Sequence, residues 1–290
     1  MKLAKAFLVG HIAALAFGLM GLLIVIPNLG NFAADPRAMK VYALGMSNGG
    51  ATHMVFGALA TFAFGWVTIG KGKTAIFFLV SFCLSLTSEL VGTGTGFPFG
   101  NYSYTDYLGW KVMDRVPFTI PLSWFYIGLA TYLLGRVIAT RFAGNQTFWT
   151  LAIGVWLLTA WDLVLDPAMA DPGMAVKFWE WHVSGPYYGM PVQNLFGWSA
   201  TGLVYMGISR LIWREEVNPA LVSDRAWFPY AVYLANMIFA MALSLSAGLW
   251  PPVVLAIIAG VSPAALALNR GGKRVPAPLE TQPWQPIPGR

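Results

Sequence analysis

The stretch Phe148–Asp166, FWTLAIGVWLLTAWDLVLD, decides the fold of this chain. It is apolar throughout except for Asp162 and Asp166, which stand near its end. A run of about 20 apolar residues has the length that an α-helix needs to cross the hydrocarbon of a bilayer. Acids at that depth are costly to bury, and they usually have a partner or a task. The stretch therefore predicts a membrane helix with two functional carboxyls near one end.

The composition of the whole chain agrees with a membrane protein. Of its 290 residues, 57% are hydrophobic and 10% are charged, whereas a soluble domain has about 25% charged residues. The net charge of +6 indicates basic loops facing anionic lipid, with no nucleic-acid partner. Phe7–Ile26 is too long an apolar run for a cleaved signal peptide. The single cysteine, Cys83, excludes an internal disulfide and a cysteine metal cage.

Eight apolar segments follow one another along the chain. They are Phe7–Ile26, Ala51–Ile69, Thr74–Leu90, Pro121–Thr140, Phe148–Asp166, Asn194–Trp213, Phe228–Leu249 and Pro252–Leu268. The last two are separated only by Gly248 and Pro251-Pro252, and the eighth is the weakest because it is short and carries Ser262-Pro263. We expect an all-α polytopic transmembrane helical bundle of about eight spans over residues 1–270, with seven spans as the alternative. Residues 271–290, rich in Pro and polar residues, are expected to form a disordered cytoplasmic tail.

The positions of the basic residues favour eight spans. With an N-terminus inside the cell, eight spans place 13 of the 18 Lys and Arg residues on the cytoplasmic side, and seven spans place nine on each side. The 13 are Lys2, Lys5, Lys71, Lys73, Arg136, Arg141, Arg210, Arg214, Arg225, Arg270, Lys273, Arg274 and Arg290. The positive-inside rule therefore predicts a plasma-membrane protein with both termini in the cytoplasm.

This topology brings the unusual polar residues to one end of the bundle. The third and fifth spans run outward, so Glu89, Asp162 and Asp166 lie near the outer ends of their helices. The long loops Val91–Ile120 and Pro167–Gln193 lie on the same side. His53, Trp124 and Asn194 are expected at the outer starts of the second, fourth and sixth spans. A site built from these groups is thus predicted on the outer side.

Asp162 and Asp166 are four residues apart, so they share one helix face. Pro167 disfavours helical geometry at Asp166, which is therefore expected to be the last residue of its helix. Burial and a neighbouring carboxylate both disfavour the charged form of a carboxyl group. One of the two acids is then suited to donating a proton at neutral pH. The alternative is a pair of structural acids bonded to Arg, Trp or Tyr side chains of neighbouring helices.

Two further motifs carry titratable side chains. Glu89 closes an apolar run and precedes the glycine-rich stretch Gly92–Gly96, which lacks the Lys and the preceding strand of a phosphate loop and is expected to be a turn at the membrane surface. The segment Phe178–His182 is aromatic and contains Glu180 and His182, which are candidates for orienting water or moving protons. The alternative for this segment is an aromatic anchor at the membrane interface.

Several kinds of chemistry are excluded by what the sequence lacks. Three histidines are too few for a histidine-rich di-iron site, and there is no G-x-G-x-x-G after a strand for a flavin or nicotinamide. The predicted spans contain no Lys for a retinal Schiff base. The chemistry must then be carried by carboxyls, aromatic rings and water, or by a metal held by carboxylates. Of the two we expect the first, with no resident metal and no cofactor.

The central third of the chain, about Glu89 to Trp198, resembles the carotenoid biosynthesis membrane proteins of the CruF type, the carotenoid 1,2-hydratases. The resemblance rests on Ser88-Glu89 with the following glycines, Phe97-Pro98-Phe99-Gly100-Asn101-Tyr102-Ser103-Tyr104, Val116-Pro117 through Pro121-Leu122-Ser123-Trp124, Trp161-Asp162-Leu163-Val164-Leu165-Asp166-Pro167, and Trp179-Glu180-Trp181 through Gly185-Pro186-Tyr187-Tyr188-Gly189 and Pro191 to Gly197-Trp198. It implies hydration of the terminal C1=C2 double bond of an acyclic or monocyclic carotenoid, such as a lycopene-like, γ-carotene-like or bisanhydrobacterioruberin-like polyene. The product carries a tertiary hydroxyl at C1.

This reaction requires a proton at C2 and a tertiary cation at C1, which gives the candidate residues their roles. We assign proton donation to Asp162 and the orientation of water to Asp166 or Glu89, with Glu180 and His182 as further candidates. Aromatic faces stabilise a cation by about 0.5–2 kcal/mol each. The candidates for contact with the substrate are Trp124, Trp161, Trp181, Tyr102, Asn101 and Asn194.

Two other functions compete with hydration at this stage. Asp-x-x-x-Asp on a membrane helix also suits Mg²⁺ in a prenyl-transfer enzyme or another terpenoid-modifying enzyme. The second acidic motif and the basic residues that a diphosphate would require are, however, sparse on the outer side. A proton-coupled transporter or a pigment-binding protein would also use intramembrane acids, but such proteins often contain inverted repeats, which this sequence does not show.

Overall fold

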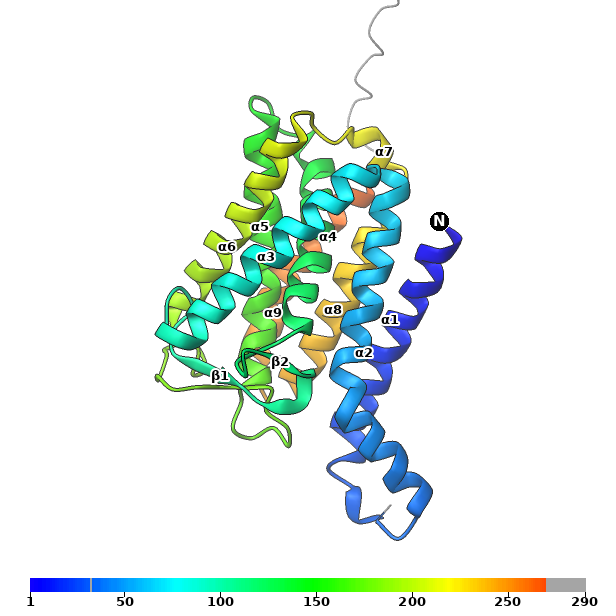
Figure 1. Cartoon of the computed structure of the whole chain (residues 1–290), viewed down its shortest axis with the longest axis vertical. Helices are drawn as coiled ribbons and strands as arrows, with labels where there is room; N and C mark the ends of the chain where they lie inside the picture. The colour runs from blue at the N-terminus through cyan, green and yellow to red at the C-terminus, as the bar shows by residue number, and fades with distance from the viewer. Residues whose placement is uncertain (32, 270–290) are drawn as a thin grey trace, which may run out of the picture.

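Long antiparallel helices run back and forth through the molecule, as Figure 1 shows for residues 1–31 and 33–269, the part that this computed structural model describes. The long helices are α1 (Lys2–Met20), α2 (Pro36–Thr68), α3 (Lys71–Thr95), α4 (Thr119–Ala139), α5 (Gln146–Met169), α6 (Val192–Trp213) and α8 (Trp227–Ser246). Shorter pieces are a π-helical turn at Gly21–Val25, α7 (Pro219–Ser223), and a last stretch made of α9 (Trp250–Leu255), a π-helical turn at Ala256–Val261 and α10 (Ser262–Ala265). The expected all-α bundle is confirmed.

Each of the eight expected spans is helical. Seven helices are long and apolar enough to cross a membrane by length and composition, and they include the last stretch, Trp250–Leu268. The helix outside that group is α6, which spans 22 residues but carries Gln193, Asn194 and Arg210. The eighth predicted segment, which is the weakest in the sequence, thus has the length and apolar composition of a membrane span. The sixth segment does not. The polar residues of α6 explain the difference.

The two ends of the described chain lie on the same side of the bundle. The Lys5 ammonium sits over the Trp227 ring, 5.4 Å from its centroid, at the start of α8. The Arg141 guanidinium, between α4 and α5, donates to the carbonyls of Leu266 and Asn269 at 2.8 and 2.7 Å. An even number of crossings therefore connects the ends. Arg270, Lys273, Arg274 and Arg290, with the predicted tail 271–290, lie outside the described residues.

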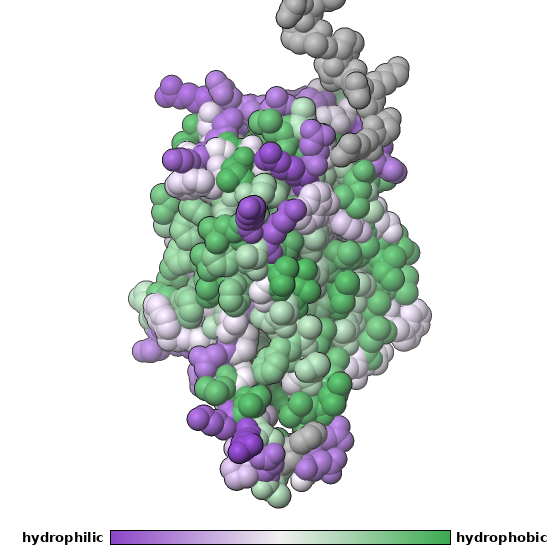
Figure 2. All heavy atoms as spheres, turned by 90° about the vertical axis from the view of Figure 1, so that its right-hand side faces the viewer, coloured by the Kyte–Doolittle hydropathy of each residue, from purple (hydrophilic) through white to green (hydrophobic). Residues whose placement is uncertain are grey.

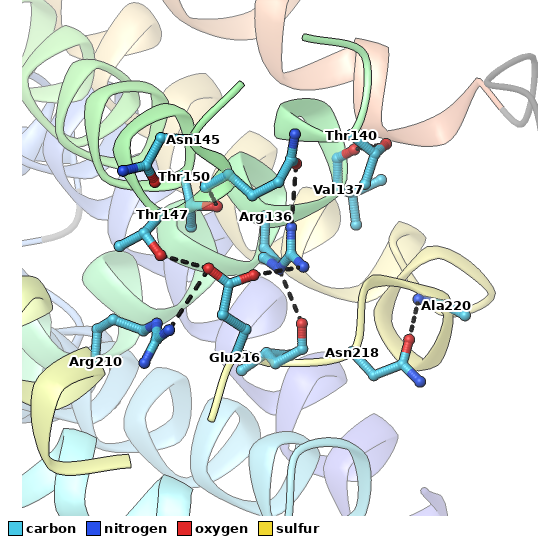
Figure 3. A network of polar contacts seen from close by, with 12 residues as sticks. Arg136, Val137, Thr140, Asn145, Thr147, Thr150, Arg210, Glu216, Asn218 and Ala220 are labelled. Atoms are coloured by element: carbon cyan, nitrogen blue, oxygen red, sulfur yellow. Dashed lines mark hydrogen bonds and ion pairs between the residues drawn. The ribbon is translucent and has the colours of Figure 1, made fainter. Parts of the chain in front are cut away.

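A network of charged groups holds this end of the bundle together (Figure 3). The buried Arg136 of α4 forms an ion pair with Glu216 at 3.0 Å, and Arg210 of α6 approaches the same carboxylate at 3.6 Å. The Thr147 hydroxyl of α5 also donates to Glu216. The loop after α6 therefore joins three helices at the end opposite to the predicted site. Figure 2 shows mostly hydrophobic side chains over the middle of the face that α1 and α2 form, with hydrophilic ones gathered at both ends.

The helix α2 begins well before the expected Ala51. Its N-terminus is set by Asp35, whose carboxylate accepts from the backbone N–H of Arg37 at 2.8 Å, and by Pro36 at the first helical position. His53 therefore lies inside a long helix, and the prediction that it stands at the helix start is wrong. The preceding turns of α2, with the end of α1, form an arm that projects beyond the bundle (Figure 1).

The helix α3 also extends further than expected, through most of the glycine-rich stretch to Thr95. The helix ends at Gly96, which adopts the left-handed conformation (φ 81°) that ends many helices. A Cβ atom at Gly92 would lie 2.8 Å from the Phe99 ring. The first glycines of this stretch therefore do not form a turn. They let the following loop pack closely against the helix that carries Glu89.

The helix α5 continues through Pro167 to Met169, so the prediction that Asp166 ends the helix is wrong. Proline removes the N–H that would bond to the carbonyl four residues earlier, here that of Leu163. The hydroxyl of Tyr187, in the loop after α5, donates to this carbonyl instead. The helix is thus continued by a tertiary contact, and Asp166 lies inside it.

Candidate active site

Two loops at the end of the bundle opposite to the charged network form a small two-stranded ribbon. Strand β1 (Tyr102–Tyr104) pairs antiparallel with β4 (Trp179–Trp181), with Tyr102 opposite Trp181 and Tyr104 opposite Trp179. Side chains alternate between the two faces of a strand. The four aromatic residues therefore share one face, and this face is turned toward the helices that carry the acids.

Glu89 receives hydrogen bonds from three side chains. Its Oε1 accepts from the Trp124 indole at 2.9 Å, and its Oε2 accepts from the hydroxyls of Tyr104, at 2.9 Å, and Tyr102. All three groups donate, which suits a carboxylate that only accepts. Glu89 is buried in the outer turns of α3, and these bonds compensate for its removal from water.

The two tyrosines of β1 are held in their protonated form. Burial disfavours the phenolate and raises the pKa of both Tyr102 and Tyr104 well above its usual value, and the nearby Glu89 carboxylate raises it further. Both hydroxyls are therefore permanent donors to Glu89 over the pH range of a living cell.

The carboxyls of Asp162 and Asp166 are joined by one amide. Asn194 Nδ2 lies 2.9 Å from Asp162 Oδ2 and 2.6 Å from Asp166 Oδ2. Asp166 also accepts from the Trp179 indole of β4, whereas Asn194 is the only hydrogen-bond partner of the Asp162 carboxyl within residues 1–31 and 33–269. The two acids therefore differ: Asp166 is tied to the ribbon, and Asp162 has the less constrained carboxyl.

All three acids line one cavity of about 60 Å³. Its walls are mainly aromatic, and the Trp124 and Trp198 rings stack with their centroids 3.9 Å apart, with Trp161 edge-on to Trp198 at 5.7 Å. The indole N–H groups of Trp161 and Trp181 are buried at this cavity and have no acceptor among the described residues. A buried donor without an acceptor is costly, so these two groups indicate a place for an oxygen atom.

The structure brings most of the predicted residues together and places three elsewhere. The cavity is lined by Glu89, Tyr102, Trp124, Trp161, Asp162, Asp166, Trp181 and Asn194. Glu180 lies on the opposite face of β4 and reaches Lys177 at 3.4 Å, and His182 Nε2 lies 2.9 Å from the Ser103 hydroxyl on that same outer face. Asn101 is exposed, and its backbone carbonyl accepts from the N–H of His182. The alternation along the strand explains why Trp179 and Trp181 face the acids while Glu180 and His182 do not.

Other side chains of the cavity were not predicted. They include Tyr104, Trp179, Trp198, Tyr126 and Asn236. Tyr104 and Trp179 flank predicted residues at strand spacing, and Trp198 stands one helical turn after Asn194. Asn236 is a buried amide within the apolar run Phe228–Leu249. The acids were selected because they are polar residues in apolar runs, and the same reasoning would have selected Asn236.

The fold and the site define a multi-pass helical membrane protein with a buried, acid-lined aromatic cavity. A family model described as carotenoid biosynthesis protein matches residues 49–263, which contain every residue of that cavity, and the chain belongs to this family. Among curated proteins, the chain is 31% identical over 174 residues to the bisanhydrobacterioruberin hydratase of Haloarcula japonica. The match covers 56% of this chain and 57% of the relative, so the chain spans little more than half of that protein. No solved structure matches the chain significantly.

Proposed function

We propose that the protein is a carotenoid 1,2-hydratase, which adds water across the terminal C1=C2 double bond of an acyclic carotenoid end group. The observation that carries the proposal is the cavity in which the sparsely bonded carboxyl of Asp162 faces aromatic rings and two further acids. Membership of a carotenoid biosynthesis family and similarity to a protein named as a hydratase support the reaction class.

The first step is protonation of the alkene. The Asp162 carboxyl donates its proton to C2, and the π electrons of the double bond form the new C–H bond, which leaves a tertiary cation at C1. Burial favours the neutral acid that this step requires. Trp124, Trp161 and Trp198 line the cavity, and an aromatic face directed at a cation contributes about 0.5–2 kcal/mol to stabilising it.

The second step is capture of the cation by water. A water molecule in the cavity can accept from a buried indole N–H group such as that of Trp161 or Trp181. Its oxygen bonds to C1, and its proton passes to Glu89 or Asp166 as the water-orienting base. Return of one proton to Asp162 completes the cycle, so the net change is the addition of one water molecule.

The proposed substrate also indicates where the protein acts in the cell. An apolar polyene dissolves in lipid, so we propose a plasma-membrane enzyme that takes its substrate from the bilayer. The nine described basic residues of the predicted cytoplasmic side lie at the end of the bundle opposite to the acids, which supports cytoplasmic termini under the positive-inside rule.

The test is expression in a bacterium engineered to accumulate lycopene or γ-carotene, followed by chromatography and mass spectrometry of the pigments. We expect a more polar pigment that is heavier by one water and has unchanged polyene absorption. Unchanged pigments from cells whose membranes contain the protein would overturn the proposal.

A further inference from the structure

A second, larger cavity lies beside the acid-lined one. Its volume is about 430 Å³, within the usual range of ligand pockets. The end of α1, the π-helical turn Gly21–Val25 and the first half of α2 form one wall, and the outer loops form the other with Leu108, Val176 and Phe178. Asp35 and Arg37 are the charged residues among its described lining, which is otherwise mostly apolar. We call this cavity the arm groove.

The arm groove adjoins the acid-lined cavity. Three residues line both spaces, namely His53, Met169 and Phe239. The His53 and Phe239 rings lie 5.7 Å apart at this junction. These three side chains therefore form the boundary between the arm groove and the acids.

A buried polar network fixes the position of the junction. The backbone carbonyl of His53 accepts from His11 Nδ1 at 2.7 Å, and His11 Nε2 accepts from the Asn236 amide at 2.9 Å. Asn236 Oδ1 in turn accepts from the Tyr126 hydroxyl at 3.0 Å. The network ties α1, α2, α4 and α8 together, so the arm keeps its place relative to the acids.

We propose that the arm groove binds the polyene chain of the substrate while the end group lies among the acids, an inference that rests on the proposed function. The acid-lined cavity, at about 60 Å³, lies well below the roughly 300–1,000 Å³ of a ligand pocket, so it takes an end group at most. The remaining length of a polyene must lie outside it. The arm groove is the adjoining space with an apolar lining suited to an elongated isoprenoid.

Two glycines of the groove wall leave free space beside the backbone. A Cβ atom at Gly21 or at Gly49 would meet no other atom within 4 Å, and both residues line the groove. Glycine is less favourable than alanine inside a helix. Glycines at such positions are therefore expected where the missing side chain leaves room for a ligand.

The test uses substitutions that add a large side chain to the groove wall and leave the acids unchanged. Gly49→Phe and Gly21→Phe place a ring in the groove, and Gly207→Phe, on α6 where a Cβ also meets nothing within 4 Å, is the matched control. Each variant is produced in lycopene-accumulating cells. We measure the lycopene retained per purified protein and the hydration of lycopene. We also measure the hydration of geranyl acetate, a short isoprenoid with the same terminal double bond. Protein in the membrane and its thermal midpoint confirm that each variant is folded.

We expect both groove variants to lose about tenfold in retained lycopene and in its hydration, equal to about 1.4 kcal/mol, with geranyl acetate hydration kept at the level of Gly207→Phe. Groove variants that retain and hydrate lycopene like the control would overturn the inference and leave the hydratase proposal standing. A wild-type protein that hydrates neither compound would overturn the hydratase proposal, and lycopene retention would still decide whether the groove binds a polyene. If one groove variant does not fold, the other supplies the comparison.

Discussion

The hydroxyl of Tyr187 donates a 3.0 Å hydrogen bond to the backbone carbonyl of Leu163. Pro167 cannot provide the N–H that this carbonyl would otherwise accept. The bond therefore replaces one backbone hydrogen bond of α5. It keeps the last turn of the helix, which contains Asp166, aligned with the turn that contains Asp162. It also links the second outer loop to the helix that carries both acids. Burial raises the pKa of Tyr187 to about 12, so the donor remains protonated at physiological pH.

Tyr187→Phe should therefore destabilise the end of α5. The substitution leaves the Leu163 carbonyl without its partner, which costs about 1–3 kcal/mol. We expect a lower thermal midpoint in detergent and reduced hydration. Tyr188→Phe is the control, since the adjacent side chain is exposed and no hydrogen bond of its hydroxyl is present in the described structure. Equal behaviour of the two variants would contradict this role of the bond.

Asp162→Asn should abolish hydration while leaving the amount of protein in the membrane unchanged. The amide keeps the shape of the side chain but cannot donate the carboxyl proton, and a general acid contributes about 10²–10⁴-fold to a rate. Pigment analysis of lycopene-accumulating cells measures the loss. Asp106→Asn, at an exposed acid paired with Lys111, should remain active. Full activity of Asp162→Asn would exclude Asp162 as the proton donor.

Glu180→Gln and His182→Ala should retain most of the hydration activity. The structure places both side chains on the outer face of β4, away from the acids. Their sequence context alone would assign them to proton transfer. Trp179→Phe, on the inner face, removes the indole donor to Asp166 and should lower activity in the same assay. A larger loss of activity from either outer-face variant than from Trp179→Phe would contradict the prediction that the outer face of the ribbon takes no part in the reaction.

Glu216→Gln should destabilise the bundle at its basic end. The ion pair with the buried Arg136 is lost, and an uncompensated buried charge is costly. We expect a loss of about 2 kcal/mol in the free energy of unfolding, measured by denaturation in detergent. Glu215→Gln is the control, because the neighbouring carboxylate is 86% exposed and lies 4.0 Å from Lys73, where an ion pair contributes little.

The same carboxylate should make stability depend on pH. Partial burial opposes ionisation of Glu216, but the Thr147 hydroxyl, Arg136 and Arg210 outweigh it and lower the pKa of Glu216 in the folded protein. A lowered pKa stabilises the fold above the pKa of the unfolded chain, about 4.3, and this contribution is lost as the pH falls through the folded value. The difference in thermal midpoint between wild type and Glu216→Gln should therefore shrink below about pH 4.

The sequence was sufficient for the bundle and for the convergence of the acids. Both depend on features that extend over whole helices, namely the apolar length of each span and the side on which basic residues gather. Glu89, Asp162 and Asp166 meet at one cavity because their helices end on the same side, and that follows from the topology alone.

The sequence was not sufficient for features set by contacts between distant segments. Three residues are too few for an alternating pattern, so the inner and outer faces of β4 become visible only when β1 pairs with it. The helix-breaking rule for Pro167 failed because a hydroxyl from another loop satisfies the freed carbonyl. The arm groove likewise depends on how the first half of α2 folds back beside α1, which no local pattern reveals.

The arm of α1 and α2 separates two tasks along the chain. Every acid and aromatic residue of the acid-lined cavity lies within residues 49–263, the part that matches the family model, whereas much of the groove wall comes from residues 17–46. If the arm groove binds the polyene chain as proposed, changes among the groove residues of the first 48 positions would alter which long molecules fit and leave the proposed proton donor in place. On the proposed function, a chimaera that carries the arm of a relative on this bundle would show whether the arm selects the long molecule that is bound.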